Sequence, residues 1–201
     1  MRKKTEERRQ AIVAVASQVF EEKGYSESTM SEIAARLGGS KATLYSYFPS
    51  KEDLLLAVVE SGASRDMAQT FARLHTEEPI ESRLRSFAVA FARLLTSPTS
   101  TSLRRLAASE AGRSNIGRLL FESGPRPFRE EAARMLKREM DAGRLRQADP
   151  VRAFQLLSGM VECEPVSHLL FGVVDRLDDA TLVAAANSAV DVFLRAYAPE
   201  A

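Results

Sequence analysis

The sequence of 201 residues predicts an all-α fold. Apolar residues recur at intervals of three and four along most of the chain, which is the spacing of one face of a helix. No segment alternates polar and apolar residues over the length of a strand. Prolines and glycines fall between the helical patterns, where they end one helix and begin the next. We therefore expect a chain built of helices alone.

Composition excludes several classes of protein. The apolar share of 45% and the charged share of 27% are ordinary for a globular chain. No run of about 18 apolar residues is present, so we expect no transmembrane helix. The start, MRKKTEERRQ, is charged and lacks the apolar region of a secretion signal, and the single cysteine, Cys163, cannot form an internal disulfide. Both features predict a cytoplasmic protein.

Charge is distributed unevenly along the chain. Residues 1–51 contain nine lysines and arginines and six aspartates and glutamates, a net charge of +3, whereas residues 52–201 have a net charge of −2. A basic first part on a slightly acidic body suggests that the first part binds a polyanion such as DNA. The alternative is a solvated surface of randomly placed charges, and charge alone does not separate the two.

Three helices are predicted in the basic part, over residues 6–23, 30–37 and 41–48. The second follows TMSE, a capping box in which Thr29 caps the helix and Glu32 reaches back to the cap. A short turn with two glycines joins the second helix to the third. Two short helices joined in this way are the sequence form of a helix-turn-helix, which lays its second helix in the major groove of DNA.

The rest of the chain predicts a larger helical body. Asp149, as a capping acid, and Pro150, at the first helical position, mark the start of one of its helices, and Pro165 should kink that helix. The last two helices are unusually apolar and rich in small residues, so they would suit a four-helix interface across a two-fold axis, with a monomer core as the alternative. The predicted helices span residues 51–74, 80–96, 101–112, 115–122, 127–142, 150–171 and 179–198.

The side chains of the third helix can be placed because each helical residue turns by about 100°. With Leu44 and Phe48 facing the core, Ala42 and Ser46 point away from it. Small side chains on that outer face would let the backbone approach base edges, while hydroxyls and lysines nearby would reach phosphates. Helix N-termini add further phosphate sites. Nine residues are thus predicted to contact DNA: Thr29, Ser40, Lys41, Ala42, Thr43, Tyr45, Ser46, Tyr47 and Lys51.

Simpler alternatives remain for two parts of this interface. For Tyr45, the less favoured alternative is packing alone within the helical hairpin. The basic residues that open the chain would form either an arm that touches phosphate or a disordered, solubilising end. These residues are Arg2, Lys3, Lys4, Arg8 and Arg9.

Residues 10–56, above all GYSESTMSEIAARLGGSKATLYSYFPSKEDLL, resemble the DNA-binding domain of TetR-family transcriptional regulators. The shared features are the Gly-aromatic pair after the first helix, the Thr cap followed by Ile-Ala, and the patterns SK-x-TLY-x-YF and SKE-x-LL. The chain departs from the family at Gly39, where the turn more often carries a β-branched residue. Ala42, often glycine in the family, still permits a close approach to DNA. LRRLAASEAGRSNIGRLLFESGP and GRLRQADPVRAFQLLSG resemble the C-terminal domain of the AefR-like and AcrR-like subgroup.

The resemblance implies a helix-turn-helix DNA-binding domain over residues 1–51 and a helical effector-binding and dimerisation domain over residues 52–201. It also implies a homodimeric repressor, paired through the helices at about 150–171 and 179–198, on a near-palindromic double-stranded operator. A small-molecule effector would release the DNA. A transcriptional activator or an effector-independent regulator remains the alternative. No HExxH, GxSxG or Walker motif is present, so we expect no enzyme, and we expect neither a cofactor, a metal nor a membrane partner.

The body contains candidate residues for an effector pocket, although most of them would also suit a plain helical core. Glu164 and His168 are four residues apart and would pair on one helix face. A buried Glu164 would need a cationic partner, whereas exposure at an edge is the simpler alternative. The candidate pocket residues are Met67, Phe71, Phe87, Phe91, Phe121, Met135, Met160, Glu164 and His168.

Overall fold

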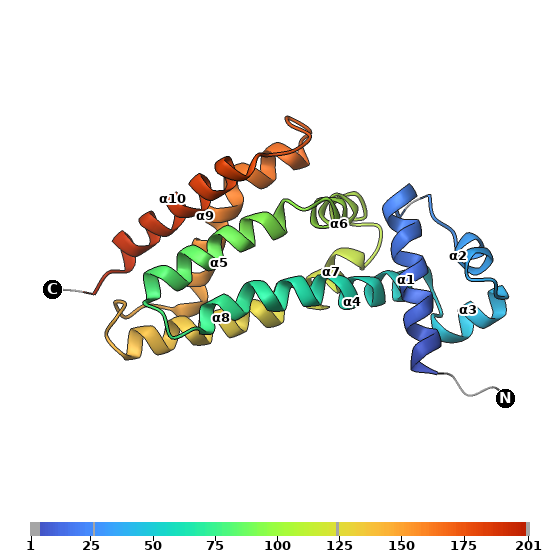
Figure 1. Ribbon diagram of the computed structural model, residues 1–201, viewed down its shortest axis with the longest axis horizontal. Helices are drawn as coiled ribbons and strands as arrows, with labels where there is room; N and C mark the ends of the chain where they lie inside the picture. The colour runs from blue at the N-terminus through green and yellow to red at the C-terminus, as the bar shows by residue number, and fades with distance from the viewer. Residues whose placement is uncertain (1–4, 26, 124, 200–201) are drawn as a thin grey trace. The chain divides into compact units, whose positions relative to one another are not determined.

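The computed structural model describes residues 5–25, 27–123 and 125–199, and the regular secondary structure of these residues is helical throughout (Figure 1). The predicted all-α fold is confirmed. The helices are α1 (Glu6–Lys23), α2 (Met30–Arg36), α3 (Lys41–Tyr47), α4 (Lys51–Ala72), the 3-10 turn η1 (Arg73–His75), α5 (Ile80–Leu95), α6 (Pro98–Ser109), α7 (Ile116–Ser123), α8 (Pro125–Asp141), α9 (Pro150–Leu170) and α10 (Asp179–Tyr197).

Helix ends agree with the predicted bounds to within three residues. The largest differences occur at α6 and α8, which begin earlier than predicted, at Pro98 and Pro125. Proline suits a first helical position because the N–H that it lacks would have no partner within the helix. The Ser97 hydroxyl also accepts a hydrogen bond from the backbone N–H of Ser100 at 3.2 Å, which supports the early start of α6.

The chain forms two compact units. The first unit comprises Met1–Ser64 and Leu106–Gly124, and the second comprises Arg65–Arg105 and Pro125–Ala201. Two helices, α4 and α6, begin in one unit and end in the other. The division after residue 51 stays a prediction of the sequence.

The core of the first unit is shared by α1, α2, α3 and the start of α4. Apolar residues three and four apart on α1 face this core, as the helical period requires. Gly24, with φ of 79°, ends α1, and this predicted stop is confirmed. The completely buried side chains are Ile12, Ala16, Val19, Ile33, Leu44 and Leu54.

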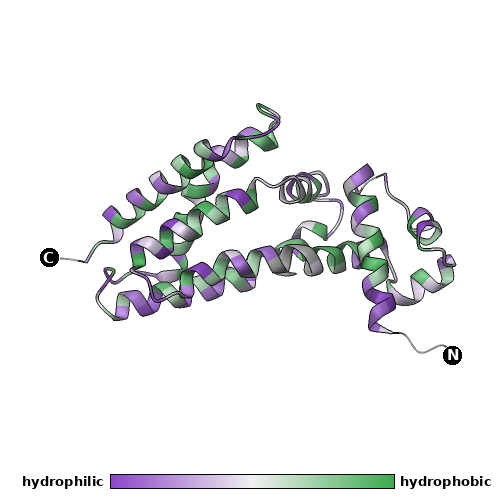
Figure 2. Ribbon diagram, in the orientation of Figure 1, coloured by the Kyte–Doolittle hydropathy of each residue, from purple (hydrophilic) through white to green (hydrophobic). Residues whose placement is uncertain are grey.

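The second unit is organised by α5, which packs against α9 and α10, while α8 packs against α9. Apolar and polar residues interleave along these helices, so each can bury one side (Figure 2). Phe71, in the last turn of α4, lies within the core of this unit. Its ring centroid is 5.0 to 5.9 Å from those of four other phenylalanines, namely Phe87, Phe91, Phe128 and Phe154.

The start of α9 is capped as predicted. The Asp149 carboxylate accepts hydrogen bonds from the backbone N–H groups of Val151 at 2.9 Å and Arg152 at 3.2 Å. Pro165 lies inside α9, which continues past it to Leu170. Its side chain is buried, so the helix keeps the proline on its core side. The kink expected at Pro165 stays a prediction.

A buried ion pair joins α5 to the end of α8. Arg83 donates to Glu139 at 2.8 Å, and their side chains are only 10% and 5% exposed. Arg83 also donates to the backbone carbonyl of Leu74 at 3.1 Å. Arg144 donates to the second oxygen of Glu139 at 2.6 Å, and this hydrogen bond is the main reason why the pKa of the Glu139 carboxyl is lowered despite its burial. The carboxylate therefore holds three segments of the second unit together.

Replacing Glu139 with alanine should lower the free energy of unfolding by about 3 kcal/mol, because Arg83 would keep a buried charge without its partner. Urea denaturation of the purified protein measures this. Glu130→Ala, on the same helix, is the matched control, since Glu130 pairs with Arg126 at 56% and 59% exposure and should matter little. Equal effects of the two substitutions would contradict the importance of the buried pair.

Candidate nucleic-acid interface

Backbone hydrogen bonds fix the turn between α2 and α3, and a capping residue fixes the start of each of the two helices. Gly38 has φ of 65°, in the left-handed region that glycine enters without strain. The Thr29 hydroxyl accepts from the N–H of Glu32 at 3.2 Å, and the Ser40 hydroxyl accepts from the N–H of Thr43 at 3.1 Å. Both caps lie where the sequence predicts them. They fix the start of each helix of the predicted helix-turn-helix.

The Glu32 side chain does not complete the predicted capping box. Its carboxylate pairs instead with Lys23 at 2.7 Å, and with Arg36 at 3.4 Å. Arg36 in turn pairs with Glu22 at 2.6 Å. The hydrogen bond from Lys23 is the main cause of a lowered pKa of the Glu32 carboxyl. A nearby ammonium attracts this carboxylate more strongly than a neutral amide would, so the side chain ties α2 to α1 instead of capping it.

One side of α3 is anchored in the core of the first unit. Leu44 is completely buried and Phe48 is 3% exposed, as the predicted orientation of the helix requires. Phe48 follows the last residue of α3 and has extended backbone dihedrals, which is expected of a residue before proline.

The opposite side of α3 faces solvent. Lys41, Ala42 and Ser46 are exposed, and Tyr45 is 48% exposed. Thr43 is half-buried, and its hydroxyl lies 2.9 Å from the Ser40 hydroxyl. These exposed side chains form the outer face that a groove-binding helix needs.

Two predicted contact residues take part in bonds inside the first unit. Tyr47 is half-buried, and its hydroxyl accepts a hydrogen bond from the backbone N–H of Thr5 at 3.2 Å. Lys51 donates to the backbone carbonyls of Tyr25 at 2.8 Å and Ser28 at 3.1 Å. An ammonium has three N–H donors, so these bonds use two of them. The predicted phosphate contacts of both residues stay predictions.

Sequence reasoning missed the part that Tyr25 and Ser28 take in this site. The ammonium of Lys51 lies 4.1 Å from the centroid of the Tyr25 ring, a cation–π contact. Ser28 is buried, and its hydroxyl donates to the Gly24 carbonyl at 2.6 Å. Burial, followed by the charge of Glu52, raises the pKa of the Tyr25 hydroxyl. The Gly-Tyr pair after α1 was a signal for this arrangement, which holds the α1–α2 turn against the start of α4.

Most of the candidate pocket residues lie in or against one helical core, as the simpler alternative expects. Phe71, Phe87, Phe91 and Met135 belong to the core of the second unit, and Met67 and Met160 pack against it. Phe121 belongs to the first unit and is 45% exposed, so it is not part of that core.

On α9, Glu164 has the exposed position that was the simpler alternative. Glu164 is exposed, and within the described residues it forms no ion pair with His168. Water solvates its carboxylate, so no buried charge requires a cationic partner there. A neighbouring acid, Glu162, pairs instead with Arg104 of α6.

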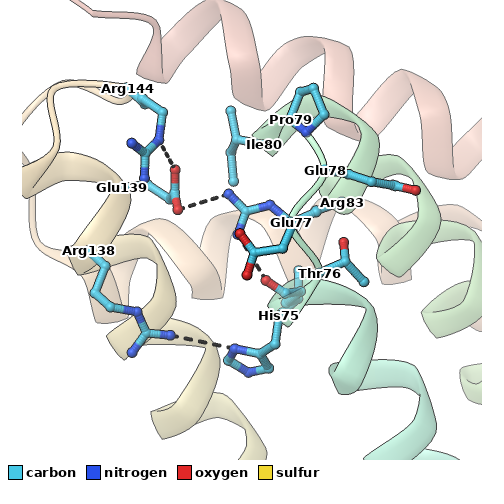
Figure 3. A pocket seen from close by; sticks show the side chains of 11 residues that line it. His75, Thr76, Glu77, Glu78, Pro79, Ile80, Arg83, Arg138, Glu139 and Arg144 are labelled. Carbon is cyan, nitrogen blue, oxygen red and sulfur yellow. Dashed lines mark hydrogen bonds and ion pairs between the residues drawn. The ribbon is translucent and has the colours of Figure 1, made fainter.

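A polar recess of about 520 Å³ lies elsewhere in the second unit (Figure 3). The 75–80 segment and the ion pair between Arg83 and Glu139 line it, with Arg138 and Arg144 at its side. His75 contributes a ring that is 2.9 Å from the carboxylate of Glu131. None of the predicted pocket residues lines this recess.

Comparisons with known proteins decide the family. The sequence model for bacterial regulatory proteins of the TetR family matches residues 12–58, and the model for the C-terminal domain of AefR-like transcriptional repressors matches residues 82–199. The chain belongs to the TetR family of transcriptional regulators. This TetR-family chain is therefore a DNA-binding regulator, and α2 and α3 lie inside the matched DNA-binding region.

Individual relatives agree with this assignment. The transcriptional activator FasR of Mycolicibacterium smegmatis is 38% identical over 86 residues, which are 43% of this chain and 39% of FasR. A TetR-family regulator from Mesorhizobium loti superposes with a TM-score of 0.86 at 29% identity, over 97% of this chain and all of that one. The flavonoid-responsive regulator FrrA superposes with a TM-score of 0.70 at 29% identity, over 98% and 100% of the two chains. The chain thus spans about two fifths of its curated relative FasR and the whole of both structural relatives.

None of the described helices combines the length and the hydrophobicity that crossing a bilayer would require.

Lys51→Ala should destabilise the TetR-family DNA-binding region by about 2 kcal/mol, because two hydrogen bonds from a charged donor and one cation–π contact are lost. Thermal or urea unfolding measures the change. Lys41→Ala is the control, since Lys41 is exposed on α3 and its removal should leave stability nearly unchanged. If both variants unfold like the parent protein, the proposed bracing of the α1–α2 turn by Lys51 is wrong.

Proposed function

We propose that the protein is a homodimeric repressor that binds a near-palindromic operator through α3 and leaves it when a small-molecule effector binds. The observation that carries this proposal is the outer face of α3, which is exposed while its other side is locked in the core. We further propose that the protein acts in the cytoplasm and has no enzymatic activity, in keeping with relatives that are regulators.

The predicted DNA contacts divide into two roles. Ala42, Thr43 and Ser46 are small enough to let α3 approach the base edges, with Thr43 offering a methyl and a hydroxyl to a base. Lys41, Tyr45 and Tyr47 flank this face and suit phosphates, as do the capping residues and Lys51. Phosphate contacts position the protein, whereas contacts with base edges give sequence preference.

The exposed sides of α9 and α10 support a dimer. Leu156 is 41% and Val192 is 49% exposed, although both are apolar. A Cβ added to Gly159 would have no neighbour within 4 Å, so the surface there is open for a partner helix. The exposed or half-exposed residues of this face, spaced three or four apart, are Leu156, Gly159, Cys163 and Ser167 on α9, and Ala184, Ser188 and Val192 on α10. Small residues allow helices to pack closely across a two-fold axis. A dimer that meets successive major grooves needs its two copies of α3 about 34–36 Å apart.

We place an apolar effector with a ring system at the phenylalanine cluster around Phe71, where it would have to displace packed side chains. Phe71 closes the last turn of α4, the helix whose first turn holds Lys51 against the α1–α2 turn. A ligand that displaces the Phe71 ring would therefore act on the helix that starts beside the DNA-binding elements. FrrA, a structural relative, is named as flavonoid-responsive, and a flavonoid is a ligand of this aromatic kind.

Activation of transcription is the second candidate function. It is favoured by FasR, which is 38% identical over the matched stretch and is named as an activator. The same operator-binding surface would serve either function. A reporter gene placed downstream of the bound DNA distinguishes the two functions. Deletion of the gene for this protein raises reporter expression if the protein is a repressor and lowers it if the protein is an activator.

Specific binding to DNA upstream of the protein's own gene tests the proposal. Fluorescence anisotropy should show tight binding that weakens steeply with salt, because several phosphates release their counterions. Thr43→Ala should change the preference between this DNA and a random duplex, whereas Lys41→Ala should weaken both alike by about threefold to tenfold. Absence of salt-dependent binding to any upstream duplex would refute the proposed repressor, and equal effects of the two variants would refute the division of roles.

Leu156→Glu tests the dimer. A charge within the α9 face should convert the protein to a monomer in analytical ultracentrifugation and weaken operator binding by about tenfold or more. The single cysteine supplies a second readout, because Cys163 should react slowly with a thiol reagent in the dimer and quickly in the variant. Gln69→Glu, an exposed change of equal charge on α4, is the control and should remain dimeric. A dimeric Leu156→Glu variant with a protected thiol would place the interface elsewhere.

A further inference from the structure

The first two turns of α1 lie against the helix-turn-helix. The backbone N–H of Thr5, which precedes α1, donates to the Tyr47 hydroxyl at 3.2 Å. The guanidinium of Arg9 lies over the Phe48 ring, 5.3 Å from its centroid. These contacts attach the start of α1 to the end of α3, so side chains of α1 share a surface with the recognition helix.

Gly39 makes room for a side chain of α1. Only Gly38, of the two glycines in the turn, has a positive φ, so the backbone does not require glycine at position 39. A Cβ added to Gly39 would lie 3.1 Å from the Nη2 atom of Arg8. Such a contact is tight, so the guanidinium would have to move by a few tenths of an ångström to admit a Cβ, and further for a branched side chain. The chain has glycine at the point where the Arg8 guanidinium lies against the turn.

Arg8 carries a positive charge that its surroundings do not balance. Its neighbour Arg9 lies 3.9 Å from Glu6, and Arg36 pairs with Glu22 at 2.6 Å. Arg8 is half-buried, yet within the described residues its guanidinium forms no ion pair. A partly desolvated arginine favours an anion, and the planar guanidinium suits the oxygens of a phosphate.

We propose that Arg8, seated against Gly39, binds a phosphate of the DNA backbone beside the start of α3. The inference rests on the proposed operator binding. Arg8 crosses the turn that precedes α3, outside the outer face formed by Ala42 and Ser46, and this position suits the sugar-phosphate strand rather than a base edge. Gly39 is a positioning residue in this arrangement, because it acts through Arg8.

The experiment measures binding of the full chain to two duplexes of about 30 base pairs, long enough for two half-sites, over a salt series. One duplex is the upstream DNA bound by the parent protein, and the other has random sequence. Arg8→Ala should weaken binding to both duplexes by the same factor and should make the slope of log affinity against log salt shallower by about 0.9 for each protomer. Arg8→Lys, which keeps the charge, should retain the slope.

Gly39→Val tests whether the glycine acts through Arg8. The branched side chain should displace the guanidinium and reproduce the loss seen with Arg8→Ala. In the Arg8→Ala background, Gly39→Val should add little, because the interaction is already absent. Arg176→Ala, in the loop before α10, controls for the loss of one positive charge and should leave affinity and slope unchanged.

Several results would overturn the inference. An unchanged affinity and slope for Arg8→Ala, with normal binding by the parent protein, would show that Arg8 touches no phosphate. A selective loss on the upstream duplex would assign Arg8 to base recognition instead. If the losses of affinity caused by Arg8→Ala and Gly39→Val simply add in the double variant, Gly39 does not act through Arg8. Failure of the parent protein to bind either duplex would refute the proposed function itself, so the two failures are distinguishable.

Discussion

The burial of Leu44 and Phe48 is the interaction on which the DNA-binding surface depends. A helix of seven residues is too short to be stable alone in water, so α3 exists because these two side chains fasten it to α1, α2 and α4. The same anchoring determines which residues face outward. Any loss of that packing would change the direction of Ala42, Thr43 and Ser46 together, since all of them are carried on one short rigid element.

Charge around this element is arranged in two ways. Most of the ions near α1 and α2 neutralise each other, as Lys23, Glu32 and Arg36 do, and such pairs join the helices without offering charge to DNA. Lys51 donates two of its three N–H groups to backbone carbonyls, so it braces the α1–α2 turn from the start of α4. The basic character of residues 1–51 is thus only partly available to a polyanion, and Lys41 is one charge that is exposed on α3.

In the second unit as well, the residues that form the core and the residues that are exposed to a partner are different groups. Phe71, Phe87, Phe91 and Phe154 lie in its core, whereas the small residues Gly159, Cys163, Ala184 and Ser188 are exposed on α9 and α10. Arg83 and Glu139 are buried charged groups of this unit, and their ion pair joins α5 to α8. Because Phe71 belongs to α4, the packing of this core holds the end of that helix.

The sequence by itself determined the helices, their caps and the inner and outer faces of α3, because periodicity and capping are local properties of the chain. It did not determine the partners of long side chains. Glu32 turns to Lys23 instead of its own helix cap, Lys51 turns to two carbonyls, and Glu164 remains in solvent. These outcomes depend on distances between segments far apart in the chain, and only tertiary packing sets such distances. The contact between Arg8 and Gly39 has the same origin, since no spacing in the sequence relates those two positions.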